Sequence, residues 1–312
     1  MCPSYQDALP PTIRSCIKLP SDKHMLLLGF GYCAKAVLDP LKAAGFSINA
    51  TYRRDAQKAQ LIALGITPVF FDGAMTDELS STVRSASHIL SSIPPKNGID
   101  PFASLLGNAA LSARPLWVGY LSATSVYGDR QGQWVFEDEL LYPTTKRGRA
   151  RVEAELAWLE TDWPVHIFRL AGIYGPDIYG TSRHPFDKLR AGSARAVIKP
   201  DHIVNRIHVN DIASAVMASI DAPNPMTIYN IADGHPAPPQ DVLHFAADLL
   251  GVPRAPETTI DDPEISNMAR SFYSETKRVD ISRARRDLNW SPQYGDYKAG
   301  LRAISKTLSS KP

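Results

Sequence analysis

Long apolar runs, clustered cysteines and an excess of charge of one sign are all missing from this chain of 312 residues. Its cysteines, Cys2, Cys16 and Cys33, lie far apart and form no Cys-x-x-Cys pair, so we expect neither disulfides nor a zinc site, and no other metal. A formal net charge of +2 provides no basic field for a nucleic acid. Because no apolar run approaches the roughly 18 residues of a membrane span, we expect no membrane partner and a cytoplasmic location.

Residues 1–24 also lack a feature, the continuous apolar segment of a secretion signal, because prolines and charged residues interrupt them. We interpret 1–24 as an N-terminal extension. The chain as a whole is 44% hydrophobic and 21% charged, which is typical of a globular protein.

The most informative stretch that is present is an apolar run ending in Gly29-Phe30-Gly31-Tyr32-Cys33-Ala34, followed at once by a helix-compatible segment. A strand, a tight glycine turn and a helix in this order direct backbone N–H groups at a pyrophosphate. Gly29 would form the turn, Gly31 would admit the phosphates, and Ala34 would let the helix pack on the strand. The pattern predicts a dinucleotide site formed by Gly29, Phe30, Gly31, Tyr32, Cys33 and Ala34.

Short β-rich runs alternate with helical segments up to residue 172, which predicts an α/β fold with a Rossmann-type, doubly wound parallel sheet. Ligands of such sheets bind where the strands end. The expected strands are 25–28, 47–52, 67–71, 88–92, 116–121 and 165–170, and the expected helices are 33–44, 56–64, 76–85, 102–113 and 144–160.

The alternation loosens beyond residue 172, with helices expected at 211–220, 240–250 and 281–288 and a strand at 227–230. We therefore divide the chain after the extension into a dinucleotide-binding domain, 25–172, and a smaller C-terminal α/β substrate lobe. The lobe comprises 173–201 and 233–312, and residues 202–232 are expected to return to the first domain.

Further motifs follow the glycine turn in a fixed order, and together they cover nearly all of the chain after residue 24. They are Ser125-Val126-Tyr127-Gly128-Asp129, Arg169-Leu170-Ala171-Gly172-Ile173-Tyr174-Gly175-Pro176, Asn205-Arg206-Ile207-His208-Val209-Asn210-Asp211-Ile212-Ala213 and Tyr229-Asn230-Ile231-Ala232-Asp233-Gly234. This series resembles the extended short-chain dehydrogenase/reductase superfamily of the sugar-nucleotide epimerase/dehydratase type. The turn has fewer glycines than is usual there, so the chain is closer to an atypical branch. The resemblance implies a nicotinamide cofactor, an anionic small-molecule substrate such as a sugar nucleotide, and a possible homodimer through the helix at 144–160.

The choice of cofactor depends on the end of the second strand. A carboxylate at this place would bind the ribose 2′-hydroxyl of NAD, but Arg53 and Arg54 follow the strand instead. Two guanidinium groups would bind a 2′-phosphate, which favours NADP, with NAD as second choice. The alternative is that both arginines are solvated charges at the start of a surface helix.

The resemblance assigns further residues to the cofactor. Asp72 would contact adenine, although an Asp before Gly73 also favours a simple turn. The residues that would border the ribose and nicotinamide side are Ser92, Ile93, Pro94, Ser122 and Arg151.

The superfamily's catalytic set is a Ser or Thr after the fifth strand and a Tyr-x-x-x-Lys pair. Tyr142 and Lys146 match by spacing, but we expect Pro143 at the first helical position, which leaves Tyr142 outside the helix. The segment from Arg147 to Glu155 resembles the family's helix better. That register puts Arg147 at the tyrosine site, Arg151 at the lysine site and Ala123 at the Ser/Thr site.

Arginine does not release a proton near neutral pH, so the usual chemistry would need replacements, and we name Thr124, Tyr127 and Tyr142 as candidates, each equally suited to packing. The alternative is a non-catalytic NADP-binding sensor or scaffold. Arg147 and Arg151 would together grip an anion, with Arg147 on the substrate side, unless Arg151 pairs with Glu155 on the surface. By resemblance, the other substrate contacts are Arg183, His184, Asn205 and Arg206. For His208 we favour a structural role.

Overall fold

The computed structural model describes residues 23–96, 98–106, 113–266, 270 and 272–309. Apart from its last two residues, the expected N-terminal extension lies outside this part of the chain. So does most of the second half of the helix expected at 102–113, of which α5 (Ala103–Leu106) is described.

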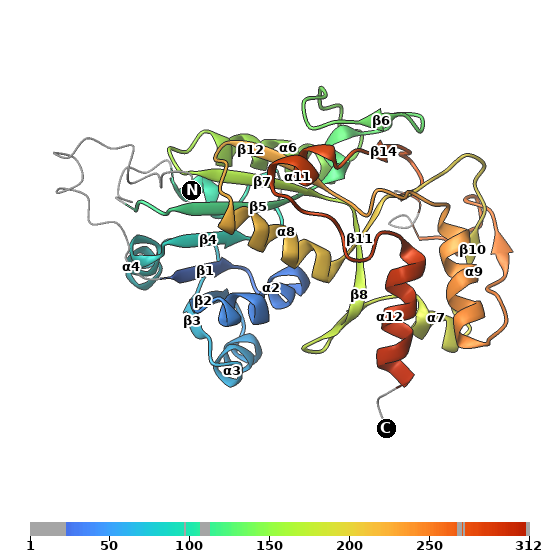
Figure 1. Ribbon diagram of the computed structural model, residues 1–312, viewed down its shortest axis with the longest axis horizontal. Coiled ribbons are helices and arrows are strands. Elements are labelled where there is room, and N and C mark those ends of the chain that lie inside the picture. The colour runs from blue at the N-terminus through green and yellow to red at the C-terminus, as the bar shows by residue number, and fades with distance from the viewer. Residues whose placement is uncertain (1–22, 97, 107–112, 267–269, 271, 310–312) are drawn as a thin grey trace.

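A seven-stranded parallel sheet forms the centre of the molecule, with the strand order β12-β7-β5-β4-β1-β2-β3 (Figure 1). The order reverses between β1 and β4, which is the switch point at which such sheets bind ligands. The predicted doubly wound α/β fold is therefore confirmed. The strands are β1 (His24–Leu28), β2 (Ser47–Tyr52), β3 (Thr67–Phe70), β4 (His88–Ser91), β5 (Trp117–Ala123), β7 (Val165–Leu170) and β12 (Thr227–Ile231).

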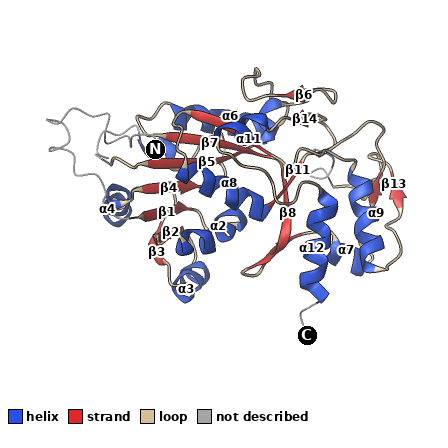
Figure 2. Cartoon of the chain, viewed as in Figure 1, coloured by secondary structure: helices blue, strands red, loops and turns tan. Residues whose placement is uncertain are grey.

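Helices cover both faces of this sheet, as Figure 2 shows. Successive strand residues point to opposite faces, so Met25 and Leu27 join one core and Leu26 and Leu28 join the other. The first core lies under α2 (Tyr32–Ala43) and α8 (Val209–Asp221), and the second under α4 (Asp77–Ser85) and α6 (Lys146–Leu159). The short helix α3 (Asp55–Ala63) lies between β2 and β3 in the chain. No helix of the described residues is both long and apolar enough to cross a bilayer.

The first residues of α4 and α6 can be compared with the starts that the sequence predicts. The Thr76 side chain accepts a hydrogen bond from the Leu79 backbone N–H and so caps α4, as expected. The expectation that Pro143 opens the next long helix is wrong. The Thr145 side chain accepts from the Gly148 backbone N–H, so α6 begins at Lys146.

The C-terminal part builds a separate, smaller layer, seen apart from the sheet in Figure 1. Its three-stranded sheet has the order β11-β8-β9, and its own core includes Tyr174, Phe186, Ala246 and Leu301. The helix expected at 240–250 is present as α9 (Pro239–Leu250). The sequence analysis did not predict the other elements of the lobe, which are β8 (Gly172–Ile178), β9 (Thr181–Arg183), α7 (Phe186–Arg190), β10 (Ala196–Val197), β11 (Arg206–His208), β13 (Glu257–Thr258) and α12 (Tyr297–Ser309).

The chain passes twice from the C-terminal lobe back to the domain of the large sheet. β11 pairs with β8 in the lobe, whereas β12 pairs with β7 in the large sheet. Further along, β14 (Arg278–Val279) pairs with β6 (Trp134–Val135), and α11 (Ser282–Asp287) lies beside β12. We therefore propose that the return to the first domain begins after β11, a few residues later than 202.

Candidate functional site

The glycine turn ties the ends of three neighbouring strands together. Gly29 has φ of +84°, and its N–H donates to Thr51 Oγ1 at 2.7 Å while Ser92 Oγ donates to its carbonyl oxygen at 3.1 Å. A Cβ on Gly29 would lie 3.0 Å from Ile93 Cγ1 and 3.2 Å from Ser92 Oγ. Only glycine meets both demands without strain. The predicted residues Ser92 and Ile93 thus form the wall behind the turn.

Gly31 fits a bound phosphate for a different reason. It is the N-cap of α2, with an extended backbone and no side-chain cap, and the first turn of α2 contains no acidic residue. A Cβ placed on Gly31 would meet no heavy atom within 4 Å among the described residues. The open space and the uncapped N–H groups together suit an anion such as a pyrophosphate.

The other residues of this turn are buried supports. Ala34 is 1% exposed and packs on the sheet, as expected for the third position of the motif. Phe30, Tyr32 and Cys33 are also buried. Burial raises the pKa of the Cys33 thiol to about 11, so it stays protonated and unreactive near neutral pH.

The two arginines after β2 are exposed. Arg54 is the N-cap of α3, and the Arg53 backbone N–H donates to Gln57 Oε1. Within the described part of the chain neither guanidinium makes a hydrogen bond or an ion pair. Asp72 is exposed and accepts from the Ala74 backbone N–H at 3.2 Å, which fits its turn-forming role. Pro94 is also exposed, after the end of β4.

Ser122 does not face the site, contrary to the sequence prediction. Its side chain is buried and its hydroxyl donates to Glu155 Oε1 at 2.5 Å. Glu155 in turn pairs with Arg169, with Nη2 and Oε2 2.8 Å apart and both side chains 3% exposed. At the end of β5 this side chain points inward to α6 and not to the ligand edge.

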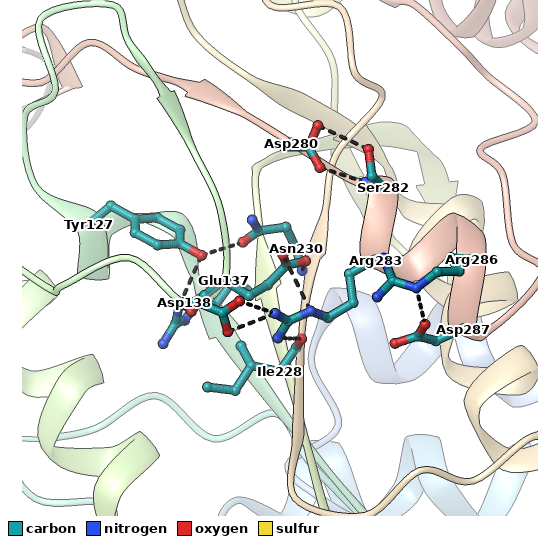
Figure 3. Close-up of polar contacts among 11 residues, drawn as sticks. Tyr127, Glu137, Asp138, Ile228, Asn230, Asp280, Ser282, Arg283, Arg286 and Asp287 are labelled. Carbon is teal, nitrogen blue, oxygen red and sulfur yellow. Dashed lines mark hydrogen bonds and ion pairs between the residues drawn. The ribbon is translucent and has the colours of Figure 1, made fainter.

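Tyr127 belongs to the same buried network. It is 0% exposed, its hydroxyl donates to Asn230 Oδ1 at 2.7 Å, and Arg169 Nη1 donates to it at 2.9 Å (Figure 3). Burial raises its pKa to about 12. A hydroxyl that is enclosed, fully bonded and hard to ionise cannot serve as the proton donor, so the geometry removes Tyr127 from the candidates.

The network continues to the C-terminal segment, as Figure 3 shows. Glu137 Oε1 accepts from the Asn230 backbone N–H at 2.9 Å. Arg283 of α11 donates to Asp138 Oδ2 at 2.6 Å and has its Nε 3.7 Å from Glu137 Oε2. These contacts fasten α11 to the loop that follows β6, and they are structural.

The remaining two candidates for proton transfer differ in position. Tyr142 is 58% exposed, lies outside α6, and has the Arg130 guanidinium 5.1 Å from its ring centre. Thr124 is half-buried and follows β5 directly, at the carboxyl edge of the sheet. Of the three candidates, Thr124 is the one that the fold places at the ligand edge.

The two arginines at the start of α6 have unequal roles. Arg151 Nη1 donates to the Leu121 carbonyl oxygen and to the Tyr120 hydroxyl, both at 2.8 Å, so it anchors α6 to β5. The alternative surface pair with Glu155 is wrong, because Glu155 faces Arg169 in the interior. Arg147, one turn earlier, is exposed.

A cavity of about 540 Å³ opens in the C-terminal lobe and is strongly basic. Among its lining residues the cations outnumber the single carboxylate of Glu264, and three tyrosines supply ring surface. The cations are Arg183, Lys188, Arg195 and Arg206, and the tyrosines are Tyr174, Tyr273 and Tyr297. Such a lining suits an anion that carries a ring.

Three of the predicted substrate residues line this cavity, whereas Arg147 and Asn205 do not. Arg183, His184 and Arg206 line it. Asn205 is buried elsewhere: its amide donates to the Lys277 carbonyl oxygen and accepts from the Val279 backbone N–H, both at 2.9 Å, so its role is structural. His208 is buried and its Nδ1 accepts from the Asn210 backbone N–H, which agrees with the structural role favoured for it.

The cavity wall contains polar atoms that no described residue satisfies. His184 Nδ1 and Gln240 Oε1 are both buried without a hydrogen bond. Burial lowers the pKa of His184, so its ring is neutral near pH 7. Buried polar atoms normally have partners, so these two atoms are available to a ligand, although His184 Nδ1 also lies 4.0 Å from Asp187 Oδ2.

Arg183 joins the cavity to the glycine turn. Its guanidinium carbon lies 5.4 Å from the ring centre of Tyr32, in the first turn of α2, and the residue also lines the cavity. The Tyr32 hydroxyl donates to the Pro176 carbonyl oxygen at 2.8 Å and so holds this junction in place. The two candidate binding sites are therefore neighbours.

Several lining residues were missed by the sequence analysis, among them Lys188, Arg195, Gln240, Tyr273 and Tyr297. They come from separate segments of the lobe, and none stands in a local motif. The one signal available was the density of arginine in 183–206, which does not show which side chains converge.

Known proteins that are similar to this chain in sequence or structure show which family it belongs to. No family model matches it. Protein YeeZ of Escherichia coli K12 is 34% identical over 195 residues, which span 61% of this chain and 63% of that protein, less than two thirds of its length. A functionally unknown conserved protein from Silicibacter pomeroyi DSS is 41% identical over 91% of this chain and 99% of that chain, with a TM-score of 0.84.

More distant structures share the architecture. The UDP-glucuronic acid 4-epimerase from Bacillus cereus, in complex with UDP-glucuronic acid and NAD, is 16% identical, with a TM-score of 0.73 over 91% of this chain and 99% of that chain. The chain therefore belongs to one family with the Silicibacter pomeroyi protein and has the fold of the extended short-chain dehydrogenase/reductase superfamily.

Proposed function

We propose that this protein binds a nicotinamide dinucleotide at the glycine turn and carries out oxidation–reduction on an anionic small molecule, such as a sugar nucleotide, in the lobe cavity. The observation that carries this proposal is the junction at Arg183, which lies on Tyr32 of the turn and also lines the cavity. The epimerase of the same fold, in complex with both NAD and UDP-glucuronic acid, supports it.

The residues of the turn fit the dinucleotide. The space beside Gly31 admits the phosphates, and the uncapped N–H groups of α2 would donate to them. We further propose NADP over NAD, because β2 ends without a carboxylate and is followed by Arg53, whose guanidinium has no partner among the described residues. A bound nicotinamide ring supplies oxidation and reduction at an alcohol or carbonyl carbon.

On the substrate side, the guanidinium groups of Arg183 and Arg206 bind the anion and orient it in the cavity. Thr124 is the residue that we propose to hydrogen-bond the reacting oxygen, because it follows β5 directly at the ligand edge. In the register that we infer from the sequence, Arg147 and Arg151 stand where the resembling enzymes have tyrosine and lysine, and they cannot exchange a proton at neutral pH.

The test combines calorimetric binding of NADP and NAD with turnover assays that follow nicotinamide absorbance over a panel of UDP-sugars and other sugar nucleotides. We expect micromolar or tighter dinucleotide binding and turnover with at least one substrate. Arg206→Met should keep the cofactor affinity and lose substrate affinity, with the exposed Arg149→Met as the matched control.

Absence of binding by both dinucleotides would overturn the proposal. Tight binding without turnover across the panel would establish the alternative, a non-catalytic sensor or scaffold. The homodimer expected through α6 also stays a prediction, and light scattering of the purified protein tests it.

A further inference from the structure

A buried carboxyl group lies behind the basic cavity and takes no part in the function proposed above. Asp233 follows β12 and is 1% exposed. Its Oδ1 accepts from the His235 backbone N–H at 2.9 Å, but its Oδ2 has no hydrogen-bond partner among the described residues. A buried carboxylate oxygen without a partner is costly, so burial favours the protonated, neutral form of this group.

Asp233 is attached to Arg206, one of the cations of the cavity wall. The Asp233 backbone N–H donates to the Arg206 carbonyl oxygen at 2.7 Å. Arg206 Nη1 donates to the carbonyl oxygens of Val204 and Ala237, at 2.9 and 3.0 Å. These two carbonyl oxygens bind the guanidinium at Nη1, so its other N–H groups are available to an anion in the cavity.

The charges of the two side chains interact without forming an ion pair. Burial lowers the pKa of Arg206, and Asp233 is the strongest of the charges that oppose this change. Burial also raises the pKa of Asp233 to about 7, against the lowering effects of the His235 backbone N–H and of Arg206. The negative charge behind Arg206 is therefore partly present at neutral pH.

We propose that Asp233 is the counter-charge that sets the affinity of the cavity for anions: ionised, it neutralises Arg206, and protonated, it leaves the guanidinium charge to the ligand. This proposal rests on the cavity being the anion site proposed above. The physical reason is that two anions compete for one cation in a poorly hydrated place, where charges interact strongly. An anion in the cavity must then favour proton uptake by Asp233, and protonation must favour the anion, by the same factor.

Other groups face this pair from each neighbouring element. Tyr174 of β8 and Tyr297 of α12 have raised pKa values and stay neutral at pH 6.5–8.5. Burial lowers the pKa of His202 and of His208 to about 4, so both rings stay neutral as well. Tyr273 acts on Arg206, and burial raises its pKa, so it stays neutral too. The Arg285 guanidinium lies beside Gly234, with its Nη2 3.9 Å from the place of a Cβ there. His235, beside Asp233 in the turn, and Asp296, before α12, also act on Asp233. His235 therefore needs a control of its own.

The experiment measures binding of UDP-glucose by calorimetry at pH 6.5 and pH 8.5. The diester pyrophosphate of this probe does not titrate in that range, so any change in affinity comes from the protein. If only the protonated form binds, a pKa near 7 for Asp233 means that affinity at pH 8.5 should be lower by about an order of magnitude. Titrations in two buffers of different ionisation enthalpy should also show proton uptake on binding at pH 8.5.

Asp233→Asn should bind UDP-glucose at both pH values with the affinity that the wild type has at pH 6.5. It keeps the oxygen that accepts from His235. His235→Gln and the exposed Asp162→Asn should both retain the pH dependence of the wild type.

Each outcome decides between the proposals. Equal wild-type affinity at the two pH values, or an unchanged pH dependence in Asp233→Asn, overturns the role of Asp233 and leaves the anion site intact. No binding of UDP-glucose at either pH overturns the anion site itself. Should Asp233→Asn fail to fold, the wild-type pH profile, the proton uptake and His235→Gln still decide.

Discussion

The turn after β1 and the start of α6 lie at the same edge of the sheet, yet they differ in what their polar groups do. At the turn, the N–H groups of α2 are uncapped by side chains and the space beside Gly31 is open. Along α6, Arg151 bonds to β5 and Glu155 pairs with Arg169 inside the protein. The first region is arranged to receive a ligand and the second to hold the molecule together.

This difference shows how a fold can retain one half of a site while the other half becomes a packing surface. Polar groups that already have buried partners gain little from a ligand, whereas unsatisfied groups gain the full value of a new hydrogen bond. In this chain the proposed cofactor half has the N–H groups that no side chain caps. The substitution of arginine at the expected tyrosine and lysine positions fits a structural use of α6.

The largest expected effect comes from breaking the buried pair on α6. Glu155→Ala leaves the Arg169 guanidinium buried without its carboxylate and also removes the acceptor of Ser122. We expect the free energy of unfolding to fall by about 3–5 kcal/mol, measured by urea denaturation. The exposed Glu153→Ala on the same helix is the control and should stay within about 0.5 kcal/mol. A loss below about 1 kcal/mol for Glu155→Ala would mean that α6 is not held as described.

The second effect concerns the open region. Gly31→Asp places a carboxylate where the phosphates would bind, and we expect dinucleotide affinity to fall at least about 100-fold, or 2.7 kcal/mol. Because Asp is a favourable N-cap, the free energy of unfolding should be unchanged or rise by up to about 1 kcal/mol. Calorimetry and urea denaturation measure the two quantities on the same sample.

Gly31→Asn separates charge from size at this position. It caps α2 equally well and carries no charge, so it should weaken binding less than Gly31→Asp does. Equal affinity of the wild type and Gly31→Asp would place the dinucleotide elsewhere and remove the contrast between the two regions.

The central sheet was predictable because its signals are local. β2 and β7 have the residues expected from their apolar runs, and Gly29 marks the turn by itself. The start of α6 was misjudged because two local rules compete there. Pro143 suits a first helical position, but the Thr145 side chain supplies the cap and fixes the start.

The candidate site was less predictable, since a motif gives the position of a residue but not the side to which it points. Ser122 and Tyr127 stand in or beside a motif at the correct edge, yet both side chains turn into the core. The cavity depends on tertiary structure even more. Lys188, Tyr273 and Tyr297 come from separate segments, so only the folded lobe brings them together.

A smaller effect would sharpen the identity of the cofactor. Arg53→Ala should weaken NADP binding by about 1–3 kcal/mol, because a charge-assisted bond to the 2′-phosphate is lost. NAD has no such phosphate, so its affinity should change little. Lys58→Ala removes one charge from the exposed side of the same helix and serves as control. An equal loss for NADP and NAD in Arg53→Ala, measured by calorimetry, would show that the guanidinium does not read the 2′-phosphate.

The smallest effect is expected at Tyr142, which matches the family's catalytic spacing but lies outside the helix. Its ring is 58% exposed and its neighbour is Arg130, and its hydroxyl makes no hydrogen bond within the described residues. Tyr142→Phe should therefore leave kcat and KM within about twofold of the wild type and the free energy of unfolding within about 0.5 kcal/mol. Steady-state kinetics on whichever substrate turns over, with cofactor affinity measured beside it, provide the check. A fall in kcat of about 100-fold or more, the scale of a lost proton donor, would return Tyr142 to the chemistry and show that the segment before α6 reaches the site once both ligands are bound.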